Sequence, residues 1–233
     1  MPEDNKDDAI SRRRFLQGTT VAGIIATAGC IGPLSNNSQN KGNTRDKFSH
    51  PSAQGFREQP YIGPELSKDN PIIIAFEDLS CPICKSFHNN TLQTLKEKYT
   101  QNDELTFVYR GTDFAGYPWG GTAALVQEAV YEKQPRRTFD VIEAYYQNQT
   151  TFTQSNVIAE SENLLQDVGI EPQPIIDAVQ NGEVNDRFKS DKTVGRKSGV
   201  RGTPTFMLFK DGFYQTTVVG AKSAVVFEDV LDL

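Results

Sequence analysis

The chain has 233 residues, of which 37% are hydrophobic and 23% are charged, and its formal net charge is −6. This length and composition suit one globular domain with a hydrophobic core and appended segments. The acidic balance, with no basic run beyond the first residues, argues against nucleic acid as a partner.

Paired arginines stand near the amino terminus. Arg12, Arg13 and Arg14 precede Phe-Leu, and residues 18–29 are mildly apolar and rich in threonine, alanine and glycine. A helix that spans a bilayer needs about 18 or more apolar residues, so this segment is too short. The arrangement resembles a twin-arginine export signal, which implies that residues 1–29 are a signal peptide. An ordinary basic arm is the alternative.

Small residues lead up to the first of three cysteines. The sequence Thr-Ala-Gly-Cys that ends at Cys30 resembles the lipobox of exported lipoproteins, which are cleaved before the cysteine and carry lipid on it. The resemblance implies that lipid on Cys30 holds the chain to the membrane, on the extracytoplasmic face of the plasma membrane in the cell envelope. It also accounts for the odd third thiol, which is a liability in an oxidising compartment. A free cysteine placed there by chance is the alternative.

Residues 31–70 are rich in Asn, Ser, Gly, Gln, Pro and Lys and have little hydrophobic periodicity. Such a composition is typical of a flexible linker. We therefore expect residues 30–70 to be a lipid-anchored disordered tether and residues 71–233 to be the folded domain. His50 is expected to be a solvated residue of the tether.

A continuous apolar run at 72–76 predicts a strand that is buried on both faces. Residues 77–80 break this pattern, and Cys-Pro-Ile-Cys at 81–84 begins an amphipathic helix that reaches about residue 99. Two cysteines with this spacing at a helix start can face each other across one turn. The exposed N–H groups and the positive end of the dipole favour thiolate on the first sulfur. This is the geometry that thiol–disulfide exchange needs.

The rest of the chain alternates strand and helix patterns. Residues 105–110 predict a second strand, parallel to the first through a right-handed crossover. An Asp-Gly turn at 211–212 predicts a β-hairpin of strands 205–210 and 213–219. A helix closes the chain at 223–231. Helical patterns between the second strand and the hairpin lie at 122–133, 138–146, 156–168, 172–180 and 183–196.

Two segments resemble landmarks of the thioredoxin superfamily. The sequence FEDLSCPIC at 76–84 is similar to the active-site segment of its DsbA-like branch, and GVRGTPTF at 199–206 is similar to a loop whose Thr-Pro bond is cis. The resemblance implies an α/β thioredoxin fold, β-α-β followed by β-β-α, with an inserted helical subdomain at about 112–198.

The resemblance also implies roles for individual residues. Cys81 would form a mixed disulfide with a protein substrate, and Cys84 would resolve it by closing the Cys81–Cys84 disulfide. Pro204, with Thr203 before it, would lie in cis opposite Cys81. There the Thr203 carbonyl could hold an extended substrate strand, and the proline would keep metal away from the thiols. Pro82 begins the helix at no cost in hydrogen bonds.

The sequence departs from the family at one acidic position. Many relatives bury an acid six residues before the first cysteine, and this chain has Ala75 there. Glu77 and Asp78 are nearer, and either could assist proton transfer to or from Cys84. Solvated loop acids are the alternative for both.

The dipeptide between the cysteines, Pro82-Ile83, contains no ionisable group. It offers the Cys81 thiolate less electrostatic support than a histidine would. We therefore expect a less extreme thiolate, which leaves oxidation, reduction and isomerisation open. Export to a compartment in which disulfides persist favours oxidation.

A metal site is another use that a cysteine pair can serve. Zinc sites need three or four protein ligands, and apart from Cys30 the chain offers only Cys81, Cys84, His88 and the remote His50. We expect no metal and no cofactor. The alternatives are a binding module with a permanently closed disulfide and a dedicated reductase for metal-centre or cytochrome assembly. The expected partners are exported proteins with thiols or disulfides and an unidentified redox partner.

Overall fold

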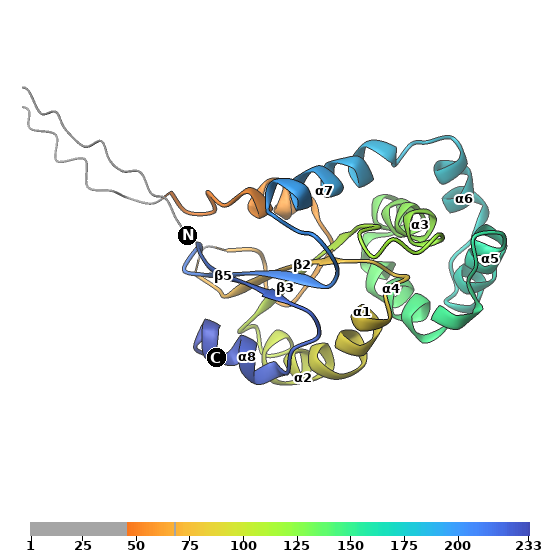
Figure 1. Ribbon diagram of the computed structural model, residues 1–233. Coiled ribbons are helices and arrows are strands. Elements are labelled where there is room, and N and C mark those ends of the chain that lie inside the picture. The colour runs from red at the N-terminus through yellow and green to blue at the C-terminus, as the bar shows by residue number, and fades with distance from the viewer. Residues whose placement is uncertain (1–45, 68) are drawn as a thin grey trace, which may run out of the picture. The chain divides into compact units, whose positions relative to one another are not determined.

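The structure is a computed structural model that describes residues 46–67 and 69–233. This part of the chain is built on a five-stranded sheet with the order β1-β3-β2-β4-β5 (Figure 1). β2 runs parallel to β3, and the other neighbouring strands are antiparallel. The strands are β1 (Tyr61–Ile62), β2 (Ile72–Glu77), β3 (Thr106–Gly111), β4 (Thr205–Lys210) and β5 (Phe213–Val219).

The central strand β2 is buried along its whole length, as the apolar run predicts. Successive side chains of a strand point to opposite faces of the sheet. Ile73 and Ala75 accordingly join one hydrophobic cluster, while Ile72, Ile74 and Phe76 join another on the opposite face. Both faces therefore need a cover of helices.

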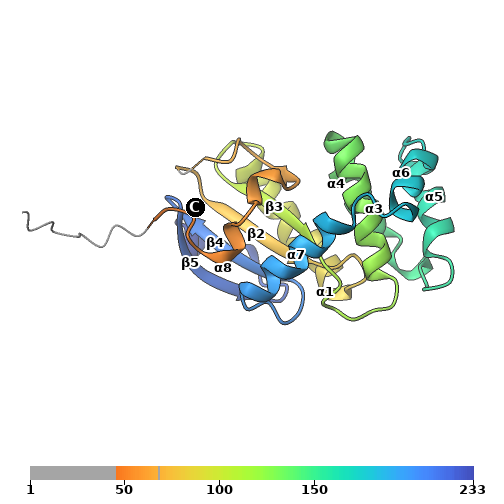
Figure 2. The ribbon, with the colours of Figure 1, turned by 90° about the horizontal axis from the view of Figure 1, so that it is seen from above.

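Helices lie on the two faces of the sheet (Figures 1 and 2). On one face Phe87, Leu95 and Phe227 pack in the same cluster as the strand residues. On the other face Val194 belongs to the cluster that contains Ile74. The covering helices are α1 (Pro82–Phe87), α2 (Gln93–Leu95) and α8 (Ala224–Leu231) on the first face, and α7 (Asn185–Lys197) on the second.

The helix that begins at the cysteines is not a regular α-helix. It runs without a break from Pro82 to Thr100, but π-helical segments at His88–Leu92 and Lys96–Thr100 follow α1 and α2. A π-bulge shifts the register of the side chains by one residue and often occurs at functional sites. The first of these segments begins at His88, one turn beyond Cys84.

The predicted helical insertion lies between β3 and β4. Its helices gather at one end of the sheet, and α7 leads back across the sheet toward β4 (Figures 1 and 2). Trp119, which precedes the first of them, stacks on Phe152 with ring centroids 4.9 Å apart and therefore serves packing. The helices before α7 are α3 (Gly120–Lys133), α4 (Thr138–Gln147), α5 (Val157–Asp167) and α6 (Gln173–Gln180).

The prediction of a disordered tether is wrong for residues 46–67, which are folded. Ala53 and Phe56 are buried in a core cluster, and β1 pairs with β3. His50, expected to be solvated, stacks on Tyr214 with ring centroids 4.0 Å apart. This segment contributes single side chains rather than an apolar face, so it has no periodicity that a sequence pattern would reveal.

The predicted export signal, Cys30 and the first half of the expected tether lie outside the described residues. Within the described ranges, no helix combines the length and the apolar character that a membrane span requires.

Candidate active site

Both cysteines of the pair lie where β2 passes into α1. Cys81 is the N-cap residue, and the N–H of Lys85 donates to its carbonyl at 3.1 Å. Pro82 follows as the first helical residue, where its missing N–H costs no hydrogen bond. Cys81 keeps 4% of its surface exposed and Cys84 keeps none. Both are free thiols, so the structure presents the pair in its reduced form.

The environment lowers the pKa of Cys81 from 9.0 to about 6. Hydrogen bonding from the Cys84 thiol is the largest cause, and burial acts against it. The backbone N–H groups of Ile83 and Cys84 stabilise the thiolate further. At pH 7 such a group is about ten parts thiolate to one part thiol. This value lies between about 3.5 for DsbA and about 7 for thioredoxin.

The second sulfur has the opposite properties. Burial raises the pKa of Cys84 well above 9, and its hydrogen bond to Cys81 and the charge of Glu77 raise it further. The pair therefore consists of one ionised sulfur and one protonated sulfur. An exchange cycle uses both states in turn: the thiolate of Cys81 acts as the nucleophile, and Cys84 beneath it holds a proton.

The second sequence landmark meets the first at Cys81. The Sγ of Cys81 lies 3.4 Å from the carbonyl oxygen of Thr203. The Thr203–Pro204 peptide bond is cis. The carbonyl of Pro204 accepts a hydrogen bond from the N–H of Gly220 at 2.9 Å, which ties this loop to the end of β5.

Glu77 is fully buried, so a solvated loop acid is the wrong description of it. Its Oε2 accepts a hydrogen bond from the Tyr146 hydroxyl at 3.0 Å. The Nε2 of His88 also lies 3.0 Å from this oxygen. The carboxylate is thus held from α4 and from the helix that carries Cys84.

Asp78 is buried too, but its contacts are those of a turn. Its Oδ1 accepts from the N–H and the hydroxyl of Ser80, and its Oδ2 accepts from the N–H of Ala115 at 3.0 Å. Burial is the main cause that raises the pKa of its carboxyl. Its backbone carbonyl accepts from the N–H of Cys81 at 2.9 Å. Asp78 therefore shapes the loop that presents Cys81.

Comparison with known proteins agrees with this geometry. A family model described as thioredoxin matches residues 57–218. The chain belongs to the thioredoxin family. The match starts before residue 71, as does the folded part of the chain.

Two curated proteins resemble this thioredoxin-family chain over most of its length. Probable disulfide bond formation protein D of Bacillus anthracis is 24% identical over 192 residues, which are 80% of this chain and 82% of that protein. The protein of the same description from Bacillus cereus is 23% identical over 192 residues, with the same coverage.

Solved structures share the fold. BdbD from Bacillus subtilis, in its oxidised form, aligns with a TM-score of 0.63 and 19% identity, over 75% of this chain and 90% of that one. The thiol-disulfide exchange protein alpha-DsbA2 from Wolbachia pipientis aligns with a TM-score of 0.62 and 21% identity, over 78% and 92%. Both support a thioredoxin-like fold.

Three residues of this thioredoxin-family site carry no motif that singles them out. Gln149 donates through Nε2 to the carbonyls of Leu79 at 2.8 Å and Cys81 at 3.0 Å. A residue of the helical insertion thus holds the loop that carries Cys81. Tyr146 and His88 hold Glu77. Of the three, only His88 was considered from the sequence, as a candidate zinc ligand that the small number of ligands argued against.

In the described ranges, no three His, Cys, Asp or Glu side chains come together as metal ligands would. His88 instead lies against Glu77.

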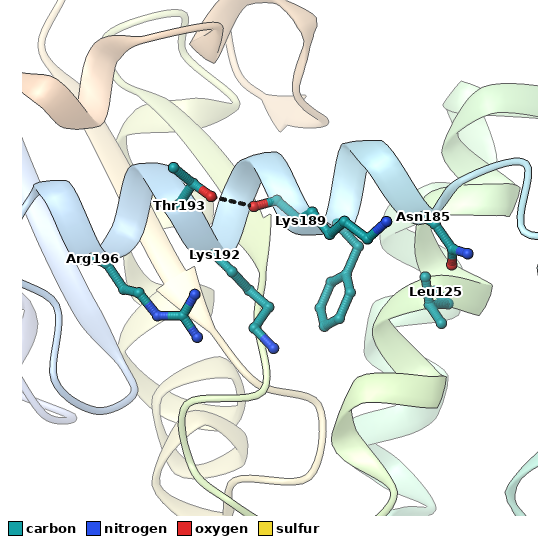
Figure 3. Close-up of a pocket in the computed structure, with 7 residues that line it drawn as sticks. Leu125, Asn185, Lys189, Lys192, Thr193 and Arg196 are labelled. Carbon is teal, nitrogen blue, oxygen red and sulfur yellow. Dashed lines mark hydrogen bonds between the residues drawn. The ribbon is translucent and has the colours of Figure 1, made fainter.

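A groove of about 560 Å³ lies between α3 and α7 (Figure 3). Two of its basic side chains have acidic partners, since Lys192 binds Asp113 at 2.7 Å and Lys189 lies 3.4 Å from Asp186. The third, Arg196, lies over the ring of Phe114, 5.7 Å from its centroid. The groove is lined by Leu125, Asn185, Phe188, Lys189, Lys192, Thr193 and Arg196, and so by neither cysteine.

Proposed function

We propose that this chain is a thiol-disulfide oxidoreductase that exchanges disulfides with exported protein substrates through Cys81 and Cys84. The observation that carries the proposal is the unequal pair of sulfurs. Cys81 has a pKa of about 6 and lies against the Thr203 carbonyl, whereas the pKa of the buried Cys84 is well above 9. The curated relatives are described as probable disulfide bond formation proteins, which is in line with this activity.

In the oxidising direction the cycle starts from the Cys81–Cys84 disulfide. A substrate thiolate attacks the sulfur of Cys81, the disulfide breaks, and Cys84 leaves as a thiolate that takes up a proton. A second substrate thiolate then attacks the substrate sulfur of the mixed disulfide, and Cys81 leaves as a thiolate. Two electrons pass from the substrate to the enzyme pair, and the substrate gains a disulfide.

Oxidation is the favoured direction. Cys81 leaves as a stable thiolate at pH 7, and stabilising the reduced form makes a disulfide a stronger oxidant. We expect a midpoint potential between about −270 mV for thioredoxin and about −120 mV for DsbA. A dedicated reductase would use the same residues in reverse, with a potential near the lower end.

The substrate is proposed to bind beside the sulfur of Cys81. The Thr203 carbonyl lies next to this sulfur, and Pro204 has no N–H that could pair with a passing strand. Ile83, two residues after Cys81, is 52% exposed and offers an apolar contact for a substrate side chain. Pro82 limits the motion of the short ring that the disulfide closes.

The two buried acids are proposed to support this chemistry differently. The charge of Glu77 raises the pKa of Cys84, and this buried carboxylate is proposed to assist proton transfer to or from that sulfur. Asp78 keeps the turn in shape through Ser80 and Ala115. Neither role needs a cofactor.

Export and lipid attachment at Cys30 are proposed from the sequence pattern. Cys30→Ser should move the protein from the membrane fraction to the soluble fraction of the envelope while thiol exchange continues. Retention of the variant on membranes would contradict lipid attachment. A redox partner of unknown identity would then restore the active disulfide.

An insulin-reduction assay, together with a glutathione titration of the cysteine pair, tests the proposal. We expect measurable insulin reduction and a midpoint potential in the stated range. A binding module with a permanently closed disulfide would show neither exchange nor reduction by glutathione, and that result would overturn the proposal.

A further inference from the structure

We propose that Gln149 is a positioning residue for thiol exchange, whose side-chain amide holds the peptide groups that present the sulfur of Cys81. The inference rests on the proposed function, because it gives a residue of the helical insertion a part in the reactivity of Cys81. The amide does more than anchor a loop: it favours the thiolate of Cys81 over the disulfide-bonded state of the same sulfur.

The amide of Gln149 uses both of its N–H groups on the active-site loop. Its Nε2 lies 2.8 Å from the carbonyl oxygen of Leu79 and 3.0 Å from that of Cys81. A primary amide has two N–H donors, and these two carbonyls occupy both of them. The two carbonyls are two residues apart, so one side chain fixes the backbone on both sides of Ser80.

The surroundings of the loop offer no ready substitute for this amide. Residues 78–81 are each at most 4% exposed, so water has little access to their carbonyls. Among the described residues, Gln149 is the one hydrogen-bond donor to the Leu79 carbonyl. A buried carbonyl that loses its donor destabilises the arrangement around it. Loss of the amide should therefore shift the loop or let water into it.

Gln149 is itself held firmly by the helical insertion. It is 9% exposed and begins a short 3₁₀ helix, Gln149–Thr151, that follows α4. Phe152, directly after this turn, packs on Trp119 and Tyr145 with ring centroids 4.9 Å and 5.0 Å away. The amide therefore extends from a fixed point of the insertion, and its two hydrogen bonds give the loop a fixed position relative to that point.

The backbone that Gln149 holds sets where the sulfur of Cys81 meets the helix. Cys81 is the N-cap of α1, and its carbonyl also accepts from the N–H of Lys85 at 3.1 Å. An N-cap side chain can reach the free N–H groups of the second and third helical residues, which are Ile83 and Cys84 here. These donors stabilise a thiolate, whereas a disulfide sulfur carries no charge for them to stabilise. Correct placement of the N-cap therefore favours the thiolate selectively.

A positioning residue and a residue that only stabilises the fold differ in their effect on the redox equilibrium. A residue that only stabilises the fold acts on the oxidised and the reduced protein alike, so its loss leaves the midpoint potential of the cysteine pair unchanged. A positioning residue acts on the thiolate. Its loss lowers the midpoint potential at a pH where Cys81 is ionised and leaves it unchanged at a pH where Cys81 is protonated.

Gln149→Met keeps the length of the side chain but removes the donors, so it tests the proposal. We expect the thiolate absorbance of Cys81 to titrate about one pH unit higher than in the wild type, so that attack by Cys81 at pH 6 becomes roughly 5-fold slower. The corresponding tenfold loss of thiolate stabilisation lowers the midpoint potential by about 30 mV at pH 8, with no change at pH 5. The matched control is Gln147→Met, which should behave as the wild type, because that side chain is exposed and its Nε2 lies 3.4 Å from Glu143.

NMR of the wild type keeps the proposal testable if Gln149→Met does not fold. The side-chain N–H signals of Gln149 should shift as Cys81 ionises near pH 6 in the reduced protein and stay constant in the oxidised protein. Signals that do not respond in the reduced protein would overturn the proposal. So would a Gln149→Met variant with the wild-type thiolate titration, or one whose potential falls equally at pH 5 and pH 8. Absence of exchange in the wild type would instead overturn the proposed function, since the thiolate titration is measured without a substrate.

Discussion

The sulfur of Cys81 lies 3.4 Å from the carbonyl oxygen of Thr203, although 122 positions separate the two residues. This contact brings the start of the active-site helix to the loop before β4. It places a nucleophile next to a backbone acceptor that an extended substrate could use. The first two predictions follow from this arrangement.

Cys81→Ser should abolish exchange, because the hydroxyl that replaces the thiolate is a poor nucleophile at neutral pH. Cys84→Ser should accumulate mixed disulfides with substrates, because nothing then resolves them. Mass spectrometry of the variants after incubation with reduced or disulfide-bonded peptides measures both effects. Full turnover by Cys84→Ser would show that the two roles are assigned wrongly.

Pro204→Thr should keep the fold but lengthen the lifetime of mixed disulfides, because a residue with an N–H and a hydroxyl can hold the substrate beside Cys81. The variant could also bind metal at the thiols. The lifetime of a peptide adduct and the metal content of the purified protein measure these effects. Pro118→Thr, on the exposed loop before α3, is the control. An unchanged adduct lifetime and no bound metal would contradict a role for Pro204 opposite the sulfur.

The attack rate of Cys81 should rise with pH through about 6 and then level off, as thiolate replaces thiol. Cys84→Ala should move this rise toward pH 9, because the thiol of Cys84 is the main cause of the low pKa. Cys84→Ser keeps a hydrogen-bond donor, so its midpoint should lie between those of the wild type and of Cys84→Ala. Thiolate absorbance near 240 nm, followed against pH, measures the shift. If the titration midpoint of the Cys81 thiolate stays near pH 6 in Cys84→Ala, the Cys84 thiol is not the main cause of the low pKa.

The reduced protein should gain stability as pH rises from about 6 to 9. The pKa of Cys81 is lower in the folded state than in the unfolded state, so the unfolded state binds more protons in this window. The gain is lost as pH falls through about 6. Cys84, with a pKa well above 9 in the folded state, acts in the opposite sense only above that window. Urea unfolding of the reduced protein across this range measures the effect, and Cys81→Ala should remove the slope.

Gly120→Ala should destabilise the protein and disturb the active-site loop. A Cβ there would lie 2.3 Å from Asp78 Oδ1 and 2.5 Å from the Ser80 hydroxyl oxygen. We expect a loss of about 1–3 kcal/mol in the free energy of unfolding. The matched control is Gly121→Ala in the same helix, where a Cβ would have no contact closer than 3.6 Å and a gain of up to about 1 kcal/mol is expected. Equal effects of the two substitutions would contradict the close packing at Asp78.

The sequence by itself determined the order of the strands and helices from β2 onward and the place of the two sulfurs. The apolar run 72–76 predicts a fully buried strand, and the spacing of Cys81 and Cys84 predicts a pair within one helical turn; the structure confirms both. These features are local, because neighbouring residues determine the period of a strand or helix and the chemistry of its first turn.

Only the tertiary structure decided what surrounds that pair. Glu77 is a buried acid because α4 brings Tyr146 over the end of β2 and the active-site helix brings His88 to the same oxygen. Residues 46–67 are folded because single side chains such as Phe56 join the buried cluster that contains Ile74 of β2 and Val194 of α7. Such contacts join residues far apart in the chain. The periodicity of a sequence does not predict which distant side chains will pack together.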